Sequence, residues 1–442
     1  MAVQPSSWFL TAPEISFPRR RGDPLGMQNI TNEAAEMLAP GLTNRTRDAR
    51  WITLLAWSLV QSDRAWRKTR GAGAEAADHP AERYLWLRPL ELLWVSRSIK
   101  LGGERYQAAQ WPAHRSISRW DGRSSDFNMS PAQLSSYRQL GPYGAYRVLF
   151  RTLGLTAGGD GWTPGRPALA LSQYVDGILE REASAPSWVN RPQSSDQARW
   201  WLRTGWKKWL GAGSTTSLLL SSRIPAPLST AEIAVIRPIL FPHGSARLRT
   251  ALALGTSIQA ADYVALCRLL AKKLPSAGAD PRVAWIGLLA NLNQTGIDLL
   301  RVLATALDAG IDTVPRLVLY PPATRSISKF KAAAKAWISR PVLEQQFEHA
   351  EEANILAAVG TASGEALLKR FMGHHESRGS GVRWIAVQDD RILPLGAESG
   401  IDSGSFGYRL HALGSLALQC RIISAMPAAL SSAAANTIQE DE

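Results

Sequence analysis

The stretch TNRTRDARWITLLAWSLVQSDRAWRK, residues 43–68, decides the fold. Its apolar residues Trp51, Leu54, Leu55 and Leu59 recur at the i, i+3, i+4 and i+8 positions, which share one face of an α-helix. The pattern predicts a long helix with a buried stripe. Arginines lie on the turns just before that stripe, so we expect the buried face to run into a basic end.

Helical periodicity continues on both sides of this stretch. Further helices are predicted at about 30–39, 90–100, 140–153, 246–273, 282–291, 293–309, 326–338 and 408–426. Near Gln388-Asp-Asp-Arg391 the apolar residues alternate instead, which predicts a hairpin over 382–395. The expected fold class is mainly α and multi-helical, with a small β-hairpin near the C-terminus.

Two helix starts carry capping signals. Asn29 is the expected N-cap of the helix at 30–39. Ser229 followed by Glu232 has the spacing of a capping box before an apolar run. The segment 111–131 holds few periodic apolar positions and predicts a loop or a short interrupted helix.

Composition suggests three packed segments and a tail. Residues 156–167 are rich in Gly and Pro and mark the first boundary. We expect a basic helical N-terminal domain with a candidate site loop, a basic helical DNA-binding domain, a helix-and-hairpin element that contributes to the site, and a disordered acidic tail. Their predicted ranges are 1–155, 168–340, 341–430 and 431–442.

The charge is strongly positive and unevenly spread. The net charge is +13. Residues 1–151 carry 21 Lys/Arg and 13 Asp/Glu, residues 152–340 carry 22 and 11, and residues 341–442 carry 7 and 13. A basic body with an acidic end favours a polyanionic partner, and we expect double-stranded DNA. The alternative is that the excess charge serves solubility alone.

Cysteine content and hydropathy indicate a cytoplasmic protein. The two cysteines, Cys267 and Cys420, lie far apart in apolar helical surroundings, so we expect buried thiols in a reducing compartment. Residues 1–5 lack the basic and apolar runs of a signal peptide, and no apolar stretch is long enough to span a membrane. No cofactor or metal is expected.

A basic, tryptophan-rich segment lies at 199–209. If it is helical, Arg199, Arg203 and Lys207 share one face, with Lys208 beside them. Cations next to indoles suit a surface that follows a nucleic-acid backbone. The alternative is an amphipathic helix whose tryptophans fill the core and whose cations are solvated. We favour core positions for the tryptophans and phosphate contacts for some of the cations.

A second cluster holds His374, His375, Glu376 and Arg378, followed by Arg383. Flanking glycines predict an exposed polar turn ahead of the hairpin, where the side chains could hold phosphate or sugar hydroxyls. The two histidines are adjacent, so they lack the i, i+4 spacing of a helical zinc site, and no third ligand is evident. An exposed turn without a function is the alternative.

The third cluster lies near the N-terminus. Carboxylates and an amide, Asp23, Glu33 and Asn32, stand among many cations. Gly22 and Gly26 allow a ligand to approach the backbone closely. The cations expected to contact DNA here are Arg19, Arg20, Arg21, Arg45, Arg47 and Arg50.

Four short motifs occur in a recognisable order. They are AspProLeuGly at 23–26, ProGlyLeuThrAsnArgThrArg at 40–47, LeuGlyProTyrGlyAlaTyrArg at 140–147 and HisHisGluSerArgGly…ArgTrp at 374–384. In this order the chain resembles a family of bacterial anti-phage DNA glycosylases. The resemblance implies base flipping and excision of glucosylated hydroxymethylcytosine from modified phage DNA, leaving an abasic site.

Breaking an N-glycosidic bond requires a group that stabilises the positive charge developing on the deoxyribose. Glu33, Asp23 and Glu376 are the candidate catalytic carboxylates, with Glu33 preferred because it lies on a predicted helix. The candidates for water orientation, base reading or substrate binding are Asn32, Asn128, His374, His375, Arg378 and Arg383. Two other functions stay open: a non-enzymatic DNA-binding subunit, and a metal-dependent nuclease built on the two histidines.

The basic stripe of the 199–209 segment yields a test. Replacing Arg199, Arg203 and Lys207 together should flatten the dependence of log affinity for DNA on log salt, by about 0.9 per lost phosphate contact. The measurement is a salt titration of duplex binding. An unchanged slope would remove this stripe from the interface.

Overall fold

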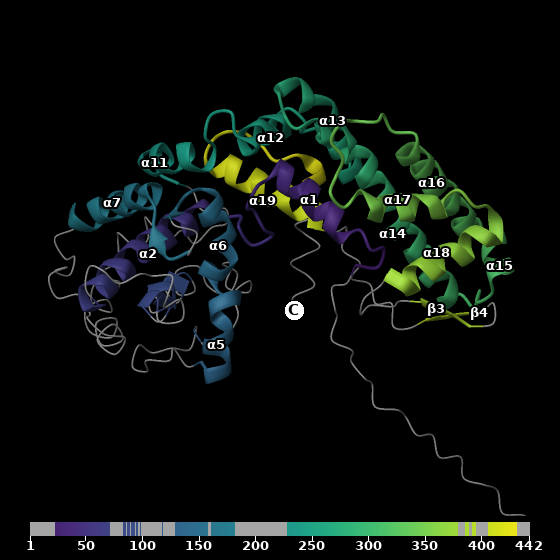
Figure 1. The fold of residues 1–442 in the computed structure, drawn as a ribbon, viewed down its shortest axis with the longest axis horizontal. Coiled ribbons are helices and arrows are strands. Elements are labelled where there is room, and N and C mark those ends of the chain that lie inside the picture. Colours follow the sequence, from purple (N-terminus) through teal and green to yellow (C-terminus); the bar gives the residue numbers. More distant parts are fainter. Residues whose placement is uncertain are drawn as a thin grey trace, which may run out of the picture. The chain divides into compact units, whose positions relative to one another are not determined.

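The computed structural model confirms a mainly helical fold (Figure 1). It describes residues 23–70, 129–157, 161–181, 228–378, 385–388, 391–394 and 405–430, with parts of 83–98 and Ile117. Two small antiparallel sheets accompany the helices. β3 (Ile385–Gln388) pairs with β4 (Arg391–Pro394), as the predicted hairpin requires. β1 (Thr156–Ala157) and β2 (Thr163–Pro164) form a second, mid-chain pair that was not predicted.

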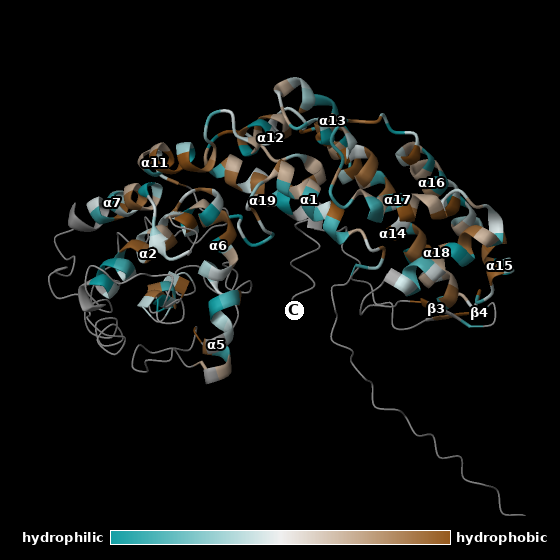
Figure 2. Ribbon diagram, viewed as in Figure 1, coloured by the Kyte–Doolittle hydropathy of each residue, from teal (hydrophilic) through white to brown (hydrophobic). Residues whose placement is uncertain are grey.

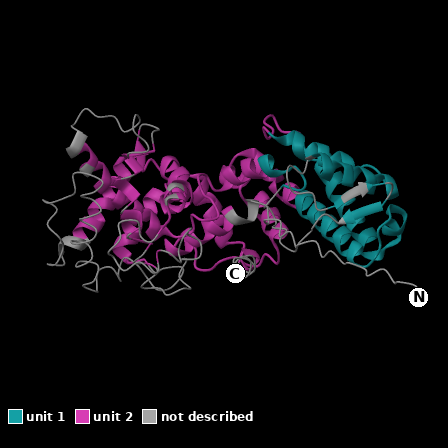
Figure 3. Cartoon of the chain, turned by 90° about the horizontal axis from the view of Figure 1, so that it is seen from below, with its two compact units in different colours: residues 1–30, 291–341, 349–404 teal, residues 31–290, 342–348, 405–442 magenta. Residues whose placement is uncertain are grey.

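The chain divides into two compact units (Figure 3). Unit 1 comprises residues 1–30, 291–341 and 349–404, and unit 2 comprises 31–290, 342–348 and 405–442. The units interleave segments of the chain, so their limits do not coincide with the consecutive ranges predicted from composition. Hydrophobic and hydrophilic residues mix along helices such as α14 and α16 in the pattern of amphipathic helices (Figure 2).

Unit 2 is built around α2 (Ala49–Arg70), the helix that the opening stretch predicts. Every residue from 49 to 63 is buried, so this part of α2 is covered on all sides and not along one stripe only. Its main neighbour is α7 (Arg166–Arg181). Trp57 Nε1 donates to Asp176 Oδ1 at 2.9 Å, which ties the two helices together.

The other helices of unit 2 refine the predicted boundaries. They are α5 (Pro131–Leu140), α6 (Pro142–Thr152), α11 (Thr230–Leu240), α12 (Ala246–Gly255), α13 (Tyr263–Lys273), α19 (Ser405–Gln419) and the short η4 (Pro275–Ala277) and η5 (Pro281–Trp285). The single helix predicted at 246–273 was wrong, because Ser257 to Asp262 break it in two. Cys267 and Cys420 are buried free thiols, as predicted.

The N-terminal helix α1 (Gln28–Leu38) begins earlier than predicted. Asn29 lies inside it, so the proposed N-cap was wrong. Asp23 satisfies the helix start instead, because its two carboxylate oxygens accept the Met27 N–H at 2.9 Å and the Gln28 N–H at 2.7 Å. Helix starts leave backbone N–H groups without partners, and this carboxylate accepts hydrogen bonds from two such groups.

Unit 1 consists of a small set of helices and the β3–β4 hairpin, which packs against α18 (Gly364–Arg378). The other helices are α14 (Ile286–Asp308, within this unit from Asn291), α15 (Val314–Leu319), α16 (Pro321–Ile338) and α17 (Ala350–Val359). The helix α14 is continuous where the sequence predicted two. Phe330 of α16 meets Phe371 of α18 edge to face, with ring centroids 5.2 Å apart.

His374 and His375 lie on α18, so the predicted exposed turn was wrong. His375 is 0 % exposed and His374 only 8 %. His374 Nε2 lies 2.8 Å from the carbonyl oxygen of Leu25, and His375 Nδ1 lies 2.8 Å from that of Pro24. A carbonyl oxygen can only accept a hydrogen bond, so His374 Nε2 and His375 Nδ1 each carry a proton and donate it. The pair therefore fixes residues 24–25 against α18.

His375→Ala should therefore lower the melting temperature. The substitution deletes a buried ring and leaves the Pro24 carbonyl without its donor, which costs about 1–3 kcal/mol for the hydrogen bond alone. The exposed Arg370 on the same helix provides the control, because Arg370→Ala removes no buried contact. Thermal unfolding by circular dichroism measures both variants, and equal melting temperatures would contradict the structural role of His375.

Candidate functional site

The start of α2 is enclosed by side chains from two distant helices of unit 2. Gln419 of α19 accepts the Ala49 N–H and donates to the Arg47 carbonyl, both at 2.8 Å. Tyr146 of α6 donates its hydroxyl to the Asp48 carbonyl at 3.0 Å and accepts the Asp48 N–H at 3.2 Å. These bonds fix the backbone at residues 47–49 on both sides.

The loop before this point is fixed locally. Thr46 Oγ1 accepts the Thr43 N–H at 2.7 Å and donates to the Thr43 carbonyl at 2.9 Å. Arg45 donates from Nη1 to the Leu140 carbonyl at 3.0 Å. Arg45 and Arg47 are half-buried. The loop therefore holds two of the arginines predicted to contact DNA on a backbone that is already ordered.

A buried cluster of charged groups lies at the base of this loop. Asp48 Oδ1 accepts the Arg50 N–H at 2.9 Å. Arg50 Nη2 forms an ion pair with Glu232 Oε2 at 3.0 Å, with side-chain exposures of 3 % and 1 %. Arg50 therefore lies in the core, which contradicts its predicted role in contacting DNA. Burying a charge costs several kcal/mol unless it is paired, and Glu232 supplies that partner.

Glu232 does not complete the predicted capping box. Ser229 Oγ accepts the Glu232 N–H at 3.0 Å, as the box requires. The Glu232 carboxylate, however, bonds Arg50. The need to pair a buried arginine outweighs one additional backbone cap.

Burial shifts the pKa values of the groups in and around this cluster. Desolvation raises the pKa of Asp48 from 3.8 to about 6, against the opposing effect of Arg50. Burial likewise lowers the pKa of His411 to about 4, assisted by the positive charge of Arg47. Desolvation raises the pKa of Cys420 to about 12.

One oxygen of each of these two buried carboxyl groups lacks a hydrogen-bond partner among the described residues. Among the residues that the structure describes, Asp48 Oδ2 and Glu232 Oε1 are buried without a hydrogen-bond partner. Buried polar atoms are nearly always bonded, so two such oxygens in one cluster call for an explanation, such as a buried water molecule. A carboxyl group with a pKa near 6 and a free oxygen suits proton transfer or the stabilisation of a cation.

A third buried carboxyl group, Glu91, serves as a comparison. Burial raises its pKa to about 7. Its Oε1 accepts the Tyr143 N–H at 2.6 Å and its Oε2 accepts the Tyr84 hydroxyl at 3.0 Å. Both oxygens are occupied by protein groups, so Glu91 stabilises the core. Asp48 differs because one of its oxygens is open.

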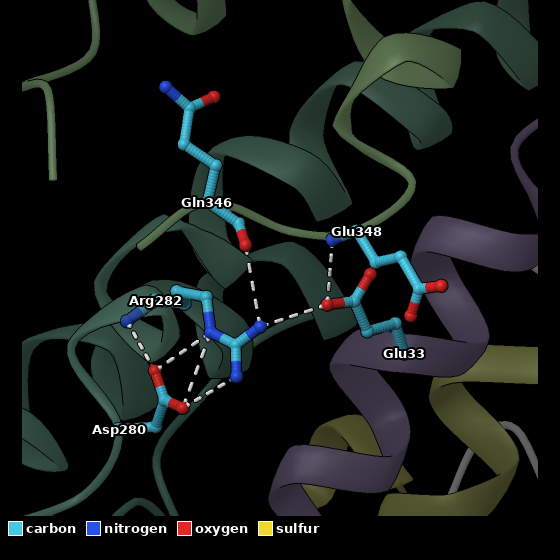
Figure 4. A network of polar contacts seen from close by, with 5 residues as sticks. All are labelled: Glu33, Asp280, Arg282, Gln346 and Glu348. Atoms are coloured by element: carbon cyan, nitrogen blue, oxygen red, sulfur yellow. Dashed lines mark hydrogen bonds and ion pairs between the residues drawn. The ribbon is translucent and has the colours of Figure 1, made fainter. Parts of the chain in front are cut away.

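Glu33, the preferred catalytic carboxylate, is held in a structural network (Figure 4). Its Oε1 accepts Arg282 Nη1 and the Glu348 N–H, each at 3.0 Å. Arg282 also donates from Nη2 to Asp280 Oδ2 at 2.8 Å, and this bond lowers the pKa of Asp280. The network fastens the segment 342–348 to η5 and α1 within unit 2.

The remaining predicted residues divide between the two units. Asp23, which caps α1, lies in unit 1 next to the residues that His374 and His375 hold. Glu376 is half-buried on α18, and Asn32 is half-buried on α1. Arg378 is the last residue of α18. Predicted residues outside the described ranges are Arg19, Arg20, Arg21, Asn128, Arg199, Arg203, Lys207, Lys208 and Arg383.

Sequence reasoning missed Asp48 and singled out Glu232 only as part of a helix cap. Asp48 stands between two arginines that it did single out, and its position directly before the buried stripe was the available signal. Glu91 had a clearer signal, because it interrupts an apolar helical run between Leu90 and Leu92. A lone carboxylate in such a run is buried when the helix packs.

Comparison with known proteins finds no match: no family model, no curated protein and no solved structure is similar to this chain. Within the described ranges, no three His, Cys, Asp or Glu side chains converge as a metal site would require. None of the helices in those ranges is both long and apolar enough to cross a membrane.

The raised pKa of Asp48 predicts how stability depends on pH. The pKa is about 6 in the folded chain against 3.8 for an exposed carboxyl group, so the folded state holds the proton between these values. Stability from this group should therefore fall as pH rises from about 4 to about 6, by about 3 kcal/mol in total. Asp48→Asn should remove that fall, as measured by urea unfolding at pH 4 and pH 7.

The control for this measurement is Asp308→Asn, at an exposed carboxylate of α14. It should retain the wild-type difference between the two pH values. If Asp48→Asn also retains that difference, the Asp48 carboxyl group is not its source.

Proposed function

We propose that the protein binds double-stranded DNA and acts as a monofunctional DNA glycosylase. The proposed substrate is glucosylated hydroxymethylcytosine of phage DNA, as the resemblance of the four motifs implies. The observation that carries the proposal is the open, buried oxygen of Asp48 at the base of an ordered loop that holds Arg45 and Arg47. The net charge of +13 supports a polyanionic partner.

The proposed chemistry uses one carboxylate and one water. The bond between the anomeric carbon and the base nitrogen breaks, its electron pair leaves with the base, and positive charge develops on the deoxyribose. Above pH 6 the Asp48 carboxylate is ionised. Its free oxygen would stabilise that charge and accept a proton from the water that adds to the anomeric carbon. The products are the free base, which gains a proton, and an abasic site.

The arginines of the loop would position the substrate. Arg45 and Arg47 are half-buried, so part of each residue is accessible to solvent. Guanidinium groups bind phosphate through paired hydrogen bonds. Phosphates on either side of an extruded nucleotide would thus be held by groups on the same ordered backbone as Asp48, and such ordering lowers the barrier to reaction.

A DNA-binding subunit without catalytic activity is the second candidate. It is favoured by the engagement of Asp23 and Glu33, two of the carboxylates singled out from the sequence, in helix capping and in an ion pair. The nuclease alternative is disfavoured, because His374 and His375 are buried on α18 and no three metal-ligating side chains converge within the described ranges.

Incubation of the purified protein with glucosylated phage DNA, with and without EDTA, tests the proposal. Alkali-sensitive abasic sites should form in both conditions. Asp48→Asn should reduce single-turnover base release at least 100-fold, within the range that a positioned acid–base group contributes. Glu33→Gln is the matched control and should keep a near-wild-type rate once its stability is verified.

Other outcomes assign other functions. Strand breaks that require a metal would indicate a nuclease, and binding without base release would indicate the non-enzymatic subunit. If Glu33→Gln abolishes base release while Asp48→Asn does not, the catalytic carboxylate is Glu33.

A further inference from the structure

Helix α16 of unit 1 carries positive charge without any acidic residue. Its sequence, PPATRSISKFKAAAKAWI, contains four cations and no Asp or Glu. Three of the cations are exposed and the fourth, Lys331, is half-buried. Among the described residues none of the four has an acidic partner within ion-pair distance. The four are Arg325, Lys329, Lys331 and Lys335.

The core fixes which face of α16 points outward. Its buried residues include Phe330, Ala334 and Trp337, which form a continuous apolar stripe. Phe330 packs on Phe371, and Trp337 Nε1 donates to Asn354 Oδ1 of α17 at 3.0 Å. The opposite face therefore remains turned to solvent and cannot rotate without breaking these contacts.

The exposed face has two rows of cations. At about 100° per residue, Arg325 and Lys329 fall on one side of the face, and Lys331 and Lys335 on the other. The rows lie about 120° apart around the helix axis. Residues four apart are separated by about 6 Å along the axis, so each row is a pair of charges at regular spacing.

Small residues form the crest between the rows. Ser328 and Ala332 are exposed there. Ser328 donates its hydroxyl to the Thr324 carbonyl at 3.0 Å, so its side chain lies back against the helix. The crest thus lacks long side chains, while both flanks have them.

We propose that α16 binds in the major groove of duplex DNA, with its two rows of cations contacting the phosphates on either side. The major groove is about 12 Å wide, and an α-helix with its side chains is about 10–12 Å across. A crest of small residues permits close approach to the base edges, and flanking cations reach the two backbones. The inference deepens the DNA-binding part of the proposed function and rests on it.

Nearby arginines of the same unit show how α16 differs. Arg301 has Asp298 at 3.4 Å and Arg316 has Asp312 at 3.9 Å. An acidic neighbour offsets part of the attraction of each arginine to a phosphate. The cations of α16 have no such neighbour on their own helix, so this helix is the better phosphate-binding surface.

The test is a salt titration of binding to a 20-base-pair duplex by a variant in which all four cations of α16 become glutamine. The slope of log affinity against log salt should become shallower by about 3.6, at about 0.9 for each lost contact. The matched control replaces Arg237, Lys272, Arg301 and Arg316, which are also exposed, with glutamine. It removes the same charge and should change the slope by less than about 1.

Ala332→Trp tests the fit in the groove separately from the charge. A bulky ring on the crest should weaken duplex binding at least 10-fold while the melting temperature of the protein stays unchanged. Duplex RNA of the same sequence should bind more weakly than DNA, because its major groove is too narrow for a helix. Wild-type affinity of Ala332→Trp, or equal binding to duplex RNA, would overturn binding in the major groove.

Failure of this inference is distinguishable from failure of the proposed chemistry. Binding that depends on α16 without any base release would leave the inference intact and remove the glycosylase. Base release by the wild-type protein, together with an unchanged salt slope in the α16 variant, would support the glycosylase and overturn the role of α16. A protein that does not bind duplex DNA would overturn both.

Discussion

The backbone at residues 47–49 is the point on which unit 2 depends. A helix start leaves backbone N–H groups without partners, and α2 is buried along its first four turns, where water cannot supply them. Tyr146 accepts the Asp48 N–H and Gln419 accepts the Ala49 N–H, and these two partners lie 98 and 370 residues away in the sequence. The buried start of the central helix therefore depends on partners from α6 and α19, which are distant in the chain.

The same burial produces the chemistry of the cluster. Arg50 enters the core with α2, and it requires an anion there, which Glu232 provides. Asp48 directly precedes α2, so it is buried together with the start of that helix. This burial raises its pKa. A carboxyl group with a raised pKa is thus a consequence of how the helix starts. Function requires more than this shift, and the open oxygen of Asp48 is what distinguishes it from Glu91, whose oxygens are both bonded.

Periodicity predicted the helical fold class, the hairpin now seen at 385–394 and the helix α2, because apolar spacing reports which residues are buried. It failed where a long-range contact decides the outcome. His374 and His375 look like an exposed polar turn until residues 24–25 cover them. Arg50 was predicted to be a surface cation, but its buried ion pair with Glu232 places it in the core. Neither partner can be identified from one sequence, since each lies more than 180 residues away.

The motifs that carry the resemblance bind one another in pairs. In unit 1, the carbonyls within the motif at 23–26 accept the histidines of the motif at 374–384. In unit 2, Arg45 of the motif at 40–47 donates to Leu140, the first residue of the motif at 140–147. Tyr146 of that same motif fixes Asp48. Contacts of this kind between motifs stabilise the fold and do not by themselves indicate a particular chemistry. Within unit 2, the groups to examine for catalysis are therefore the buried carboxylate oxygens without a described partner, Asp48 Oδ2 and Glu232 Oε1.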